Sequence, residues 1–311
     1  MIGYIILVAI VLIVAVGLWY LFNLAFVRQN IDGLDDIDSP LNKFLADYRE
    51  EVIEGMKFID EHPYEELMAV SFDGLRLYGR YYKNGDAKGT ILLFHGYRSA
   101  AKRDFSCIVK TYYQMGLNVL LVDERAHGKS EGKLITFGIR ESRDVVSWLE
   151  LLNKKYGEKE YVLDGISMGA TTVLFATRFK LPNSVKGIIA DCGFTSPAEI
   201  IGIVSEKNFH ISSKLSVPVM NLLCKIIGGF DLKEFSTEKI LKDNKIPIFL
   251  LHGKADGFVP SYMSERAHKA AGGDKEIYIV EDADHGMSYL KDKKGVTKKL
   301  SSFFSRVFTF L

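Results

Sequence analysis

The chain has 311 residues, 48% of them hydrophobic and 25% charged, which is enough to bury a large core in one catalytic domain with attachments. A formal net charge of +1 gives no electrostatic footprint for nucleic acid, so we expect no nucleic-acid partner. The three cysteines, Cys107, Cys192 and Cys224, are too few and too scattered for a disulfide framework or a zinc site, and nothing in the sequence indicates a metal or an organic cofactor.

Residues 1–27 contain no charged side chain, and the first charge is that of Arg28. About 25 helical residues, rising about 1.5 Å each, span more than the ~30 Å hydrocarbon core of a bilayer. Trp19 and Tyr20, near the far end, suit the membrane interface. We therefore predict a transmembrane anchor over 1–27. A cleaved signal peptide is the main alternative, but its apolar region is usually about 7–15 residues long and follows a basic segment.

Residues 28–63 are more polar and acidic, and we predict a linker followed by a short helix. Beyond them, alternating residues on both sides of Asp73 and Gly74 predict a β-hairpin over 66–82. Apolar strand patterns then alternate with helical ones, which predicts an α/β domain over 64–311 with a mostly parallel sheet and helices on both faces. The expected strands are 90–94, 118–122, 161–163, 185–190, 246–251 and 276–280, and the expected helices are 104–115, 140–155, 167–179, 262–271 and 296–310.

Residues 196–245 interrupt this alternation with several helical patterns and no strand. Within them, 219–228 is strongly apolar. An insert in an α/β sheet usually covers the carboxyl ends of the strands, where ligands bind. We predict a helical lid over 196–245 and place Leu223 in the wall of a pocket for acyl groups. The alternative is a helical elaboration that packs elsewhere.

The sequence Gly165-Ile166-Ser167-Met168-Gly169 joins an apolar run to a helical pattern without a loop, and it fits the pattern G-x-S-x-G. Such a tight turn leaves no room for a Cβ at its flanking positions, which explains the glycines. The turn lifts the Ser167 hydroxyl clear of the sheet at a helix N-terminus, where backbone N–H groups favour developing negative charge. We predict that Ser167 is a nucleophile.

A serine hydroxyl needs a base near neutral pH, and the base needs a carboxylate that fixes its tautomer. Asp256 lies in a turn after the strand at 246–251, and His285 lies in a loop after the strand at 276–280. Both positions follow strands, and they therefore fall on the sheet edge that carries the serine turn. We predict that Asp256 is the acid and His285 the base. Asp191, at the end of the preceding strand, is the alternative acid.

An oxyanion hole needs two N–H donors, one of which follows the nucleophile in sequence. We predict that these donors are the backbone N–H groups of Met168 and of Tyr97, which lies in the loop after the strand at 90–94. His95 in the same loop and His252 at a strand end are predicted to be structural.

Taken together, these motifs resemble the α/β-hydrolase superfamily over about residues 64–311. Within it they are most similar to bacterial serine hydrolases grouped with Bem46-like proteins, cinnamoyl esterases and lysophospholipase-like enzymes. The resemblance includes the turn at 123–130, where many members have D-x-R-G-x-G-x-S. Here Ala126 replaces the first glycine and His127 precedes the second. The resemblance implies the α/β-hydrolase fold and the same serine, acid and base.

We therefore expect a membrane-anchored serine hydrolase that cleaves a small-molecule or lipid-like carboxylic ester through an acyl-enzyme intermediate. A peptidase or thioesterase that uses the same triad is the nearest alternative. A non-catalytic binding protein on a hydrolase fold is more distant, because such a protein is free to lose a triad residue and this sequence retains all three.

Overall fold

Eight strands form one sheet in the computed structural model, which describes residues 1–34, 36–87, 89–157 and 159–309. The spatial order is β1-β2-β4-β3-β5-β6-β7-β8. The predicted hairpin is present as an antiparallel pair at one edge, and every pair from β4 onward along this order is parallel. The strand bounds are β1 (Glu65–Val70), β2 (Arg76–Tyr82), β3 (Gly89–Phe94), β4 (Asn118–Val122), β5 (Glu160–Ile166), β6 (Val185–Asp191), β7 (Ile248–Gly253) and β8 (Lys275–Val280).

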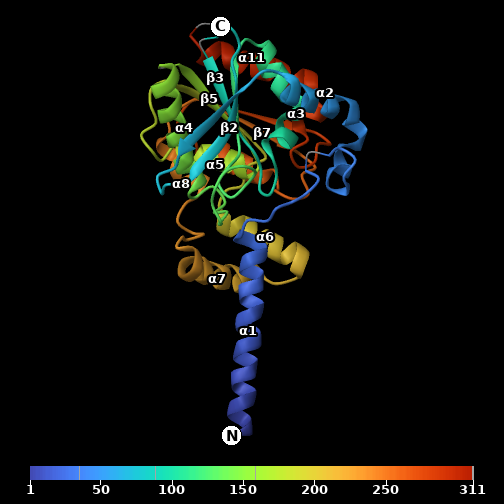
Figure 1. Cartoon of the computed structure of the whole chain (residues 1–311), viewed down its shortest axis with the longest axis vertical. Coiled ribbons are helices and arrows are strands. Elements are labelled where there is room, and N and C mark those ends of the chain that lie inside the picture. Colours follow the sequence, from blue (N-terminus) through green and yellow to red (C-terminus); the bar gives the residue numbers. More distant parts are fainter. Residues whose placement is uncertain (35, 88, 158, 310–311) are drawn as a thin grey trace.

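Helices cover both faces of this sheet, as the alternating sequence pattern predicts (Figure 1). Successive strand residues enter opposite cores because side chains alternate along a strand; Leu163 of β5 faces one core and Val162 the other. Phe310, the predicted end of the last helix, and Leu311, the predicted end of the domain, lie outside the described residues. One face packs on α4 (Glu141–Tyr156), α5 (Met168–Ala176) and α9 (Tyr262–Ala270), and the other on α2 (Arg49–Glu61), α3 (Ala101–Gln114) and α11 (Lys293–Val307).

The segment predicted to be a linker and short helix packs closely on the domain. It contains the 3-10 helix η1 (Pro40–Tyr48) and then α2. Leu45, Val52 and Met56 form a small apolar cluster with Met287, which follows β8 in the chain. Of the residues that recur at helical spacing in this segment, Leu45 and Val52 are buried against the domain, whereas Leu41 and Phe44 are exposed.

The segment between β6 and β7 is helical, as its sequence predicts. Its inner side chains, among them Met220 and Cys224, share one apolar cluster with Met168 at the start of α5. The helices over 197–223 therefore lie at the carboxyl edge of the sheet, where Figure 1 shows them beside the end of α1, whereas Leu241 packs in the core with α4, α5 and α9. The elements are α6 (Pro197–Phe209), α7 (Ser213–Leu223), the π-helical turn η2 (Cys224–Gly228), α8 (Thr237–Ile240) and the 3-10 turn η3 (Leu241–Asp243).

The N-terminal helix α1 (Ile2–Phe26) projects from the domain (Figure 1). It is long and apolar enough to cross a membrane, and only 6% of its most apolar window is buried. Its last turns are nevertheless part of the domain, because Phe22 and Phe26 are fully buried. The Phe26 ring lies 5.5 Å from that of Phe137 and 5.7 Å from that of Phe230, in edge-to-face arrangements. Packing, and not only a linker, therefore joins α1 to the domain.

This packing predicts the effect of shortening the Phe26 side chain. Phe26→Ala should lower the free energy of unfolding by about 3–5 kcal/mol, because it leaves a cavity among apolar side chains. Ile10→Ala, at an exposed position of α1, is the matched control and should leave domain unfolding unchanged. Urea unfolding of both variants in one detergent, followed by near-UV circular dichroism, measures the difference. Equal stability of the two variants would show that the end of α1 does not belong to the core.

Candidate active site

β5 turns into α5 at a single residue, Ser167, whose φ of 57° and ψ of −112° are strained for a residue with a side chain. A Cβ added at Gly165 would lie 2.2 Å from the backbone of Gly169, and one at Gly169 would lie 1.9 Å from the carbonyl oxygen of Phe94. Glycine is therefore required at both positions by the close approach of backbones. The Ser167 N–H donates to the carbonyl oxygen of Asp191 at 2.8 Å, which ties the turn to β6.

His285 lies between Ser167 and Asp256. Its Nε2 is 2.9 Å from the Ser167 Oγ, and its Nδ1 is 2.7 Å from the Asp256 Oδ2. A ring protonated on Nδ1 donates to the carboxylate and leaves Nε2 free to accept the serine hydroxyl hydrogen. The structure thus brings together the three side chains that the sequence places after β5, β7 and β8.

The Asp256 carboxyl is held by several hydrogen bonds. Its Oδ1 accepts the N–H groups of Phe258 and Val259, each at 2.8 Å, and its Oδ2 also lies 3.2 Å from the Nε2 of His252. Burial alone would raise the pKa of this carboxyl, but the hydrogen bonds from His252 and His285 outweigh it and hold the pKa well below its ordinary range. Asp256 is therefore ionised at neutral pH.

His252 supports the acid as well as the fold. Its Nδ1 accepts the Ser264 hydroxyl at 2.7 Å, and its Nε2–H faces both the carbonyl oxygen of Val259, at 2.8 Å, and Asp256. The prediction of a structural histidine agrees with the first two contacts, but it missed the contact with the acid. The available signal was the position of His252 near the end of β7, four residues before Asp256.

The other two acids near His285 have different partners. Asp191, the alternative acid, accepts the Ser288 hydroxyl at 3.0 Å, and no hydrogen bond within the described ranges joins it to His285. Asp284 accepts the N–H of Gly257 at 2.9 Å and the N–H of His285 at 2.7 Å, and so ties the two loops together. These contacts favour Asp256 over Asp191 as the partner of the imidazole.

The two predicted oxyanion donors are the backbone N–H groups of Tyr97 and Met168. Among the residues that the structure describes, the N–H groups of Tyr97 and Met168 have no hydrogen-bond partner. A Cβ added at Gly96 would lie 3.4 Å from the Ser167 Cβ, so the loop that carries Tyr97 runs beside the serine. Both N–H groups are therefore available to a negatively charged oxygen close to Ser167.

Two neutral histidines hold this loop in place. His95 donates from Nδ1 to the Gly96 carbonyl oxygen at 2.8 Å and accepts the Glu124 N–H on Nε2 at 3.1 Å, so it is structural as predicted. His127 accepts the Arg98 N–H on Nε2 at 3.0 Å. Burial holds the pKa of His127 well below its ordinary range, which keeps the ring neutral and able to accept. From the sequence, His127 stood out only as a departure from the family pattern.

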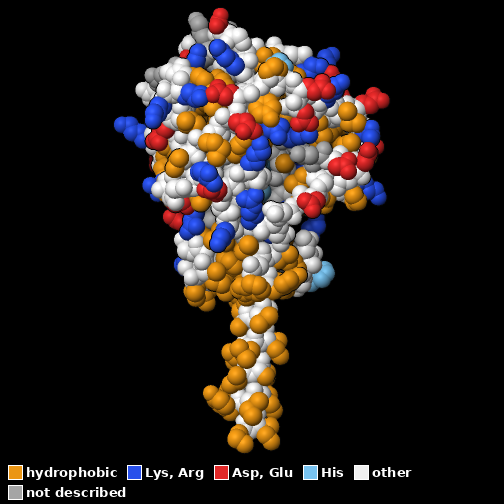
Figure 2. Space-filling model, in the orientation of Figure 1, with side chains coloured by type: hydrophobic (Ala, Val, Ile, Leu, Met, Phe, Trp, Pro, Cys, Tyr) orange, Lys and Arg blue, Asp and Glu red, His pale blue; other side chains and the backbone are white. Residues whose placement is uncertain are grey.

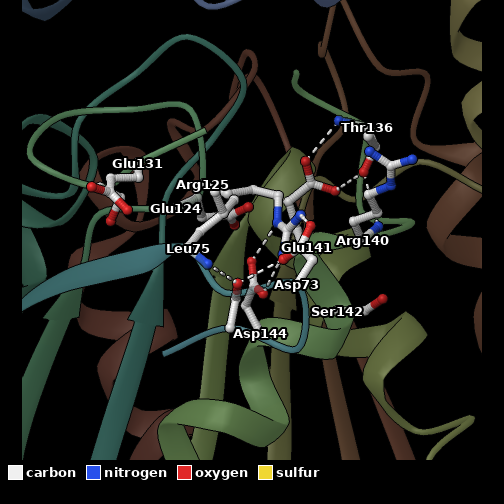
Figure 3. Close-up of polar contacts among 12 residues, drawn as sticks. Asp73, Leu75, Glu124, Arg125, Glu131, Thr136, Arg140, Glu141, Ser142 and Asp144 are labelled. Carbon is white, nitrogen blue, oxygen red and sulfur yellow. Dashed lines mark hydrogen bonds and ion pairs between the residues drawn. The ribbon is translucent and has the colours of Figure 1, made fainter. Parts of the chain in front are cut away.

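Arg125 fixes the turn that carries His127 (Figure 3). Its guanidinium donates to both carboxylate oxygens of Asp144 on α4, at 2.6 Å each, and to those of Asp73 in the hairpin, at 2.9 and 3.0 Å. In the same turn Ala126 has a φ of 62°, a conformation that glycine favours. This explains why the family pattern has glycine there, and it shows that the turn retains its shape with alanine.

A cavity of about 500 Å³ lies beside Ser167 and His285. It reaches inward to Tyr112 and Asp164, which share a hydrogen bond of 2.7 Å. Its outer wall differs from the one predicted, because it comes from η1, from the loops after β7 and β8, and from the short helix α10 (Ser288–Lys291). The residues of that outer wall are Phe44, Leu45, Tyr48, Phe258, Met287 and Leu290.

Leu223, predicted to line an acyl pocket, lies elsewhere. It is partly buried against the cluster that contains Phe22, Phe26 and Met220, and it is not among the residues that line the cavity. The apolar stretch 219–228 packs one side on the end of α1 and exposes the other, so its composition has a cause other than substrate binding. The placement of Leu223 in a substrate pocket is therefore not supported.

Cys192 completes a group of possible metal ligands with Asp256 and His285, whose ligand atoms all lie within 4.8 Å of one another. Burial holds the pKa of the Cys192 thiol well above its ordinary range, and a protonated thiol is a poor ligand. Both ring nitrogens of His285 already have hydrogen-bond partners. The chemistry of this group therefore fits a serine triad better than a metal site.

The chain has the α/β-hydrolase fold. A family model described as serine aminopeptidase, S33, matches residues 85–224. YqkD of Bacillus subtilis is 25% identical over 296 residues, which cover 95% of this chain and 94% of that protein. The Saccharomyces cerevisiae protein YNL320W, named a membrane protein, is 23% identical over 241 residues, which cover 74% of this chain and 76% of that protein.

Two solved structures share the architecture. The esterase Pf2001 of Pyrococcus furiosus has a TM-score of 0.64 at 23% identity, over 81% of this chain and 95% of that chain. Est1E of Butyrivibrio proteoclasticus, solved with ferulic acid bound, has a TM-score of 0.60 at 17% identity, over 78% of this chain and 99% of that chain. At these identities, the similarity establishes the fold.

The buried Asp191 carboxyl predicts a dependence of stability on pH. Burial raises its pKa to about 6. A pKa that is higher in the folded than in the unfolded protein means that the protonated carboxyl favours folding. This stabilisation is complete below the pKa of the unfolded chain, about 3.9, and is lost as pH rises through about 6. Asp191→Asn removes the titration, so the variant should gain up to about 3 kcal/mol over the wild type between acidic and neutral pH. Urea unfolding across that range measures the gain, and a constant difference between the two proteins would contradict the raised pKa.

Proposed function

We propose that this chain is a serine hydrolase that cleaves carboxylic esters in the domain 64–311 and is anchored to a membrane by residues 1–27. The observation that carries the proposal is the position of His285, with its Nε2 2.9 Å from the Ser167 Oγ and its Nδ1 2.7 Å from the Asp256 Oδ2. A hydroxyl that can pass its proton to a neutral imidazole is a nucleophile near neutral pH.

In the acylation step the Ser167 Oγ attacks the carbonyl carbon of the ester, and the His285 Nε2 takes the hydroxyl proton. Negative charge then develops on the carbonyl oxygen, where the N–H groups of Tyr97 and Met168 stabilise it. The ionised Asp256 stabilises the imidazolium and keeps its orientation. When the C–O bond breaks, His285 returns the proton to the leaving alkoxide, which departs as the alcohol.

In the deacylation step a water molecule attacks the acyl-enzyme, and the His285 Nε2 takes one proton of that water. The second tetrahedral intermediate collapses with protonation of the Ser167 Oγ, which releases the carboxylic acid and restores the hydroxyl. The same two N–H donors serve both steps, because each places the oxyanion at the same position.

The cavity supports a small-molecule or lipid-like ester as substrate. Its wall carries the rings of Phe44 and Tyr48 and the side chain of Leu290, which favour an apolar acyl or alcohol group. The shared fold with the esterase Pf2001 agrees with an ester substrate. Because the cavity of about 500 Å³ is bounded, activity should fall once the acyl chain exceeds its length.

A membrane anchor is supported by the length, composition and exposure of α1. The relative YNL320W, named a membrane protein, agrees with it. Residues 28–63 then connect the anchor to the domain. A cleaved signal peptide is less well supported, because Phe22 and Phe26 are buried in the domain and cleavage after them would remove part of its core.

A serine peptidase is the second candidate, because the matching family model is described as serine aminopeptidase. Both functions use the same triad. Comparing p-nitrophenyl esters with aminoacyl p-nitroanilides separates them. We expect the larger kcat/KM with the esters, and the reverse order would favour the peptidase.

Substitution of the triad residues tests the assignment of roles. Ser167→Ala should abolish the hydrolysis of p-nitrophenyl butyrate, and His285→Ala should reduce turnover nearly as far, because triad residues act as a unit. Asp256→Asn should lower kcat on the order of 10⁴-fold, because the imidazole is then held in the wrong tautomer. Initial rates on folded protein, checked by circular dichroism, measure these effects.

Asp191→Asn is the matched control for the acid. It removes a buried carboxylate at the neighbouring strand end and should lower kcat less than about tenfold, far below the loss that a missing triad acid causes. If Asp191→Asn loses most of the activity while Asp256→Asn retains it, the acid is Asp191 and the proposed roles are wrong.

A further inference from the structure

A band of exposed apolar side chains lies where α1 leaves the domain, and Figure 2 shows it below the charged surface of the domain. All of these side chains come from the end of α6, the following loop, α7 and η2, and each is between 39% and 72% exposed. We call this band the collar. It consists of Phe209, Ile211, Leu215, Val219, Leu222, Ile226 and Ile227.

The collar reverses the usual pattern of a surface helix. Leu215, Val219 and Leu222 recur at helical spacing along the exposed side of α7. The opposite side carries Met220 and, in η2, Cys224, which are buried in the cluster with the end of α1. The helix α7 and the turn η2 are therefore apolar on both sides, although only one side packs on protein. An apolar medium on the outer side accounts for this composition.

The free length of α1 sets the position of the collar relative to a bilayer. The residues from Leu21 onward contact the domain, which leaves 2–20 free. At about 1.5 Å per residue this part extends about 28 Å, close to the ~30 Å hydrocarbon core. Trp19 and Tyr20 are exposed at its end, where aromatic residues favour the interface. The inner sides of α7 and η2 pack on the next turns of α1. The collar on their outer sides therefore lies at the boundary between the hydrocarbon and the headgroups.

The charges near the collar suit lipid headgroups. The sequence 207–230 contains Lys207, Lys214 and Lys225 and no aspartate or glutamate. Lysines beside an apolar helix face are typical of helices that lie in the plane of an anionic membrane surface. Lys225 also pairs with Asp231 at 2.7 Å, which leaves Lys214 as the lysine most available to a headgroup.

We propose that the collar inserts into the headgroup–acyl boundary of the bilayer that α1 spans. The inference rests on the proposed anchoring by residues 1–27 and adds a second, interfacial contact. Two contacts would fix the orientation of the domain, which a single helix leaves free to rotate about its axis. They would also tie the catalytic loops to the membrane, since Tyr97 donates its hydroxyl hydrogen to the Ala25 carbonyl at 2.8 Å and Lys207 donates to the Gly257 carbonyl.

Quenching of tryptophan fluorescence by brominated lipids tests the proposal on the full chain. The sequence has two tryptophans, and Trp148 is fully buried in the core. In a Trp19→Phe background, Leu222→Trp places a probe in the collar. Tyr64→Trp is the matched control, because Tyr64 is 38% exposed and precedes β1, whose first residues lie at the opposite edge of the sheet, level with the start of β4. Ile226→Trp provides a second collar probe if Leu222→Trp unfolds the protein. The vesicles contain phosphatidylcholine and phosphatidylglycerol, with or without bromine on the acyl chains near the headgroup.

We expect bromine to lower the fluorescence of Leu222→Trp about twofold, as for a side chain buried about 5–10 Å into the interface, and to leave Tyr64→Trp unchanged. If Trp19 of the wild type is quenched and the collar probe is not, the collar inference fails while the anchor stands. If neither is quenched, the anchor itself fails. A blue-shifted but unquenched collar probe would mean that a second copy or another protein covers the collar, which also overturns the proposal.

Discussion

The close approach of α5 to the end of β3 is the constraint on which the candidate site depends. Gly169 lies so near the Phe94 carbonyl oxygen that a Cβ there would stand 1.9 Å from it. This approach forces β5 to turn into α5 at Ser167 alone, and it brings the loop with Tyr97 beside the N–H of Met168. The strained conformation of the serine costs on the order of 1–3 kcal/mol, which the buried parallel strands on both sides offset. The proposed nucleophile and the two proposed oxyanion donors thus follow from a single packing arrangement.

The surroundings of this turn divide into two kinds of support. On one side, neutral buried histidines and the Arg125 ion pairs hold the oxyanion loop through the turn after β4. On the other side, hydrogen bonds keep the Asp256 carboxylate charged against the cost of burial and orient His285. The proposed chemistry needs both, because a fixed oxyanion site gains nothing without a base, and the base is inert without its acid.

The strands of the sheet and the residues around His285 were predictable from the sequence, because each depends on a local signal. These signals are an apolar run, a G-x-S-x-G turn, and a polar residue just after a strand. The cavity wall was not. The helical spacing of Phe44 and Tyr48 indicates a helix, but not that these two side chains line the site. The packing of the stretch around Leu223 was not predictable either, because its apolar inner side packs on the end of α1, a contact between segments distant in sequence.

The central claim is that Ser167 is the nucleophile of this fold. Labelling the full chain with a fluorophosphonate, followed by digestion and mass spectrometry of the peptides, tests it directly. The account predicts a single phosphonyl group, attached to Ser167 in the peptide that contains it. It also predicts no label on the His285→Ala protein, because the hydroxyl reacts only when the imidazole takes its proton. A label on another serine, or ester hydrolysis that survives with Ser167 unmodified, would contradict it.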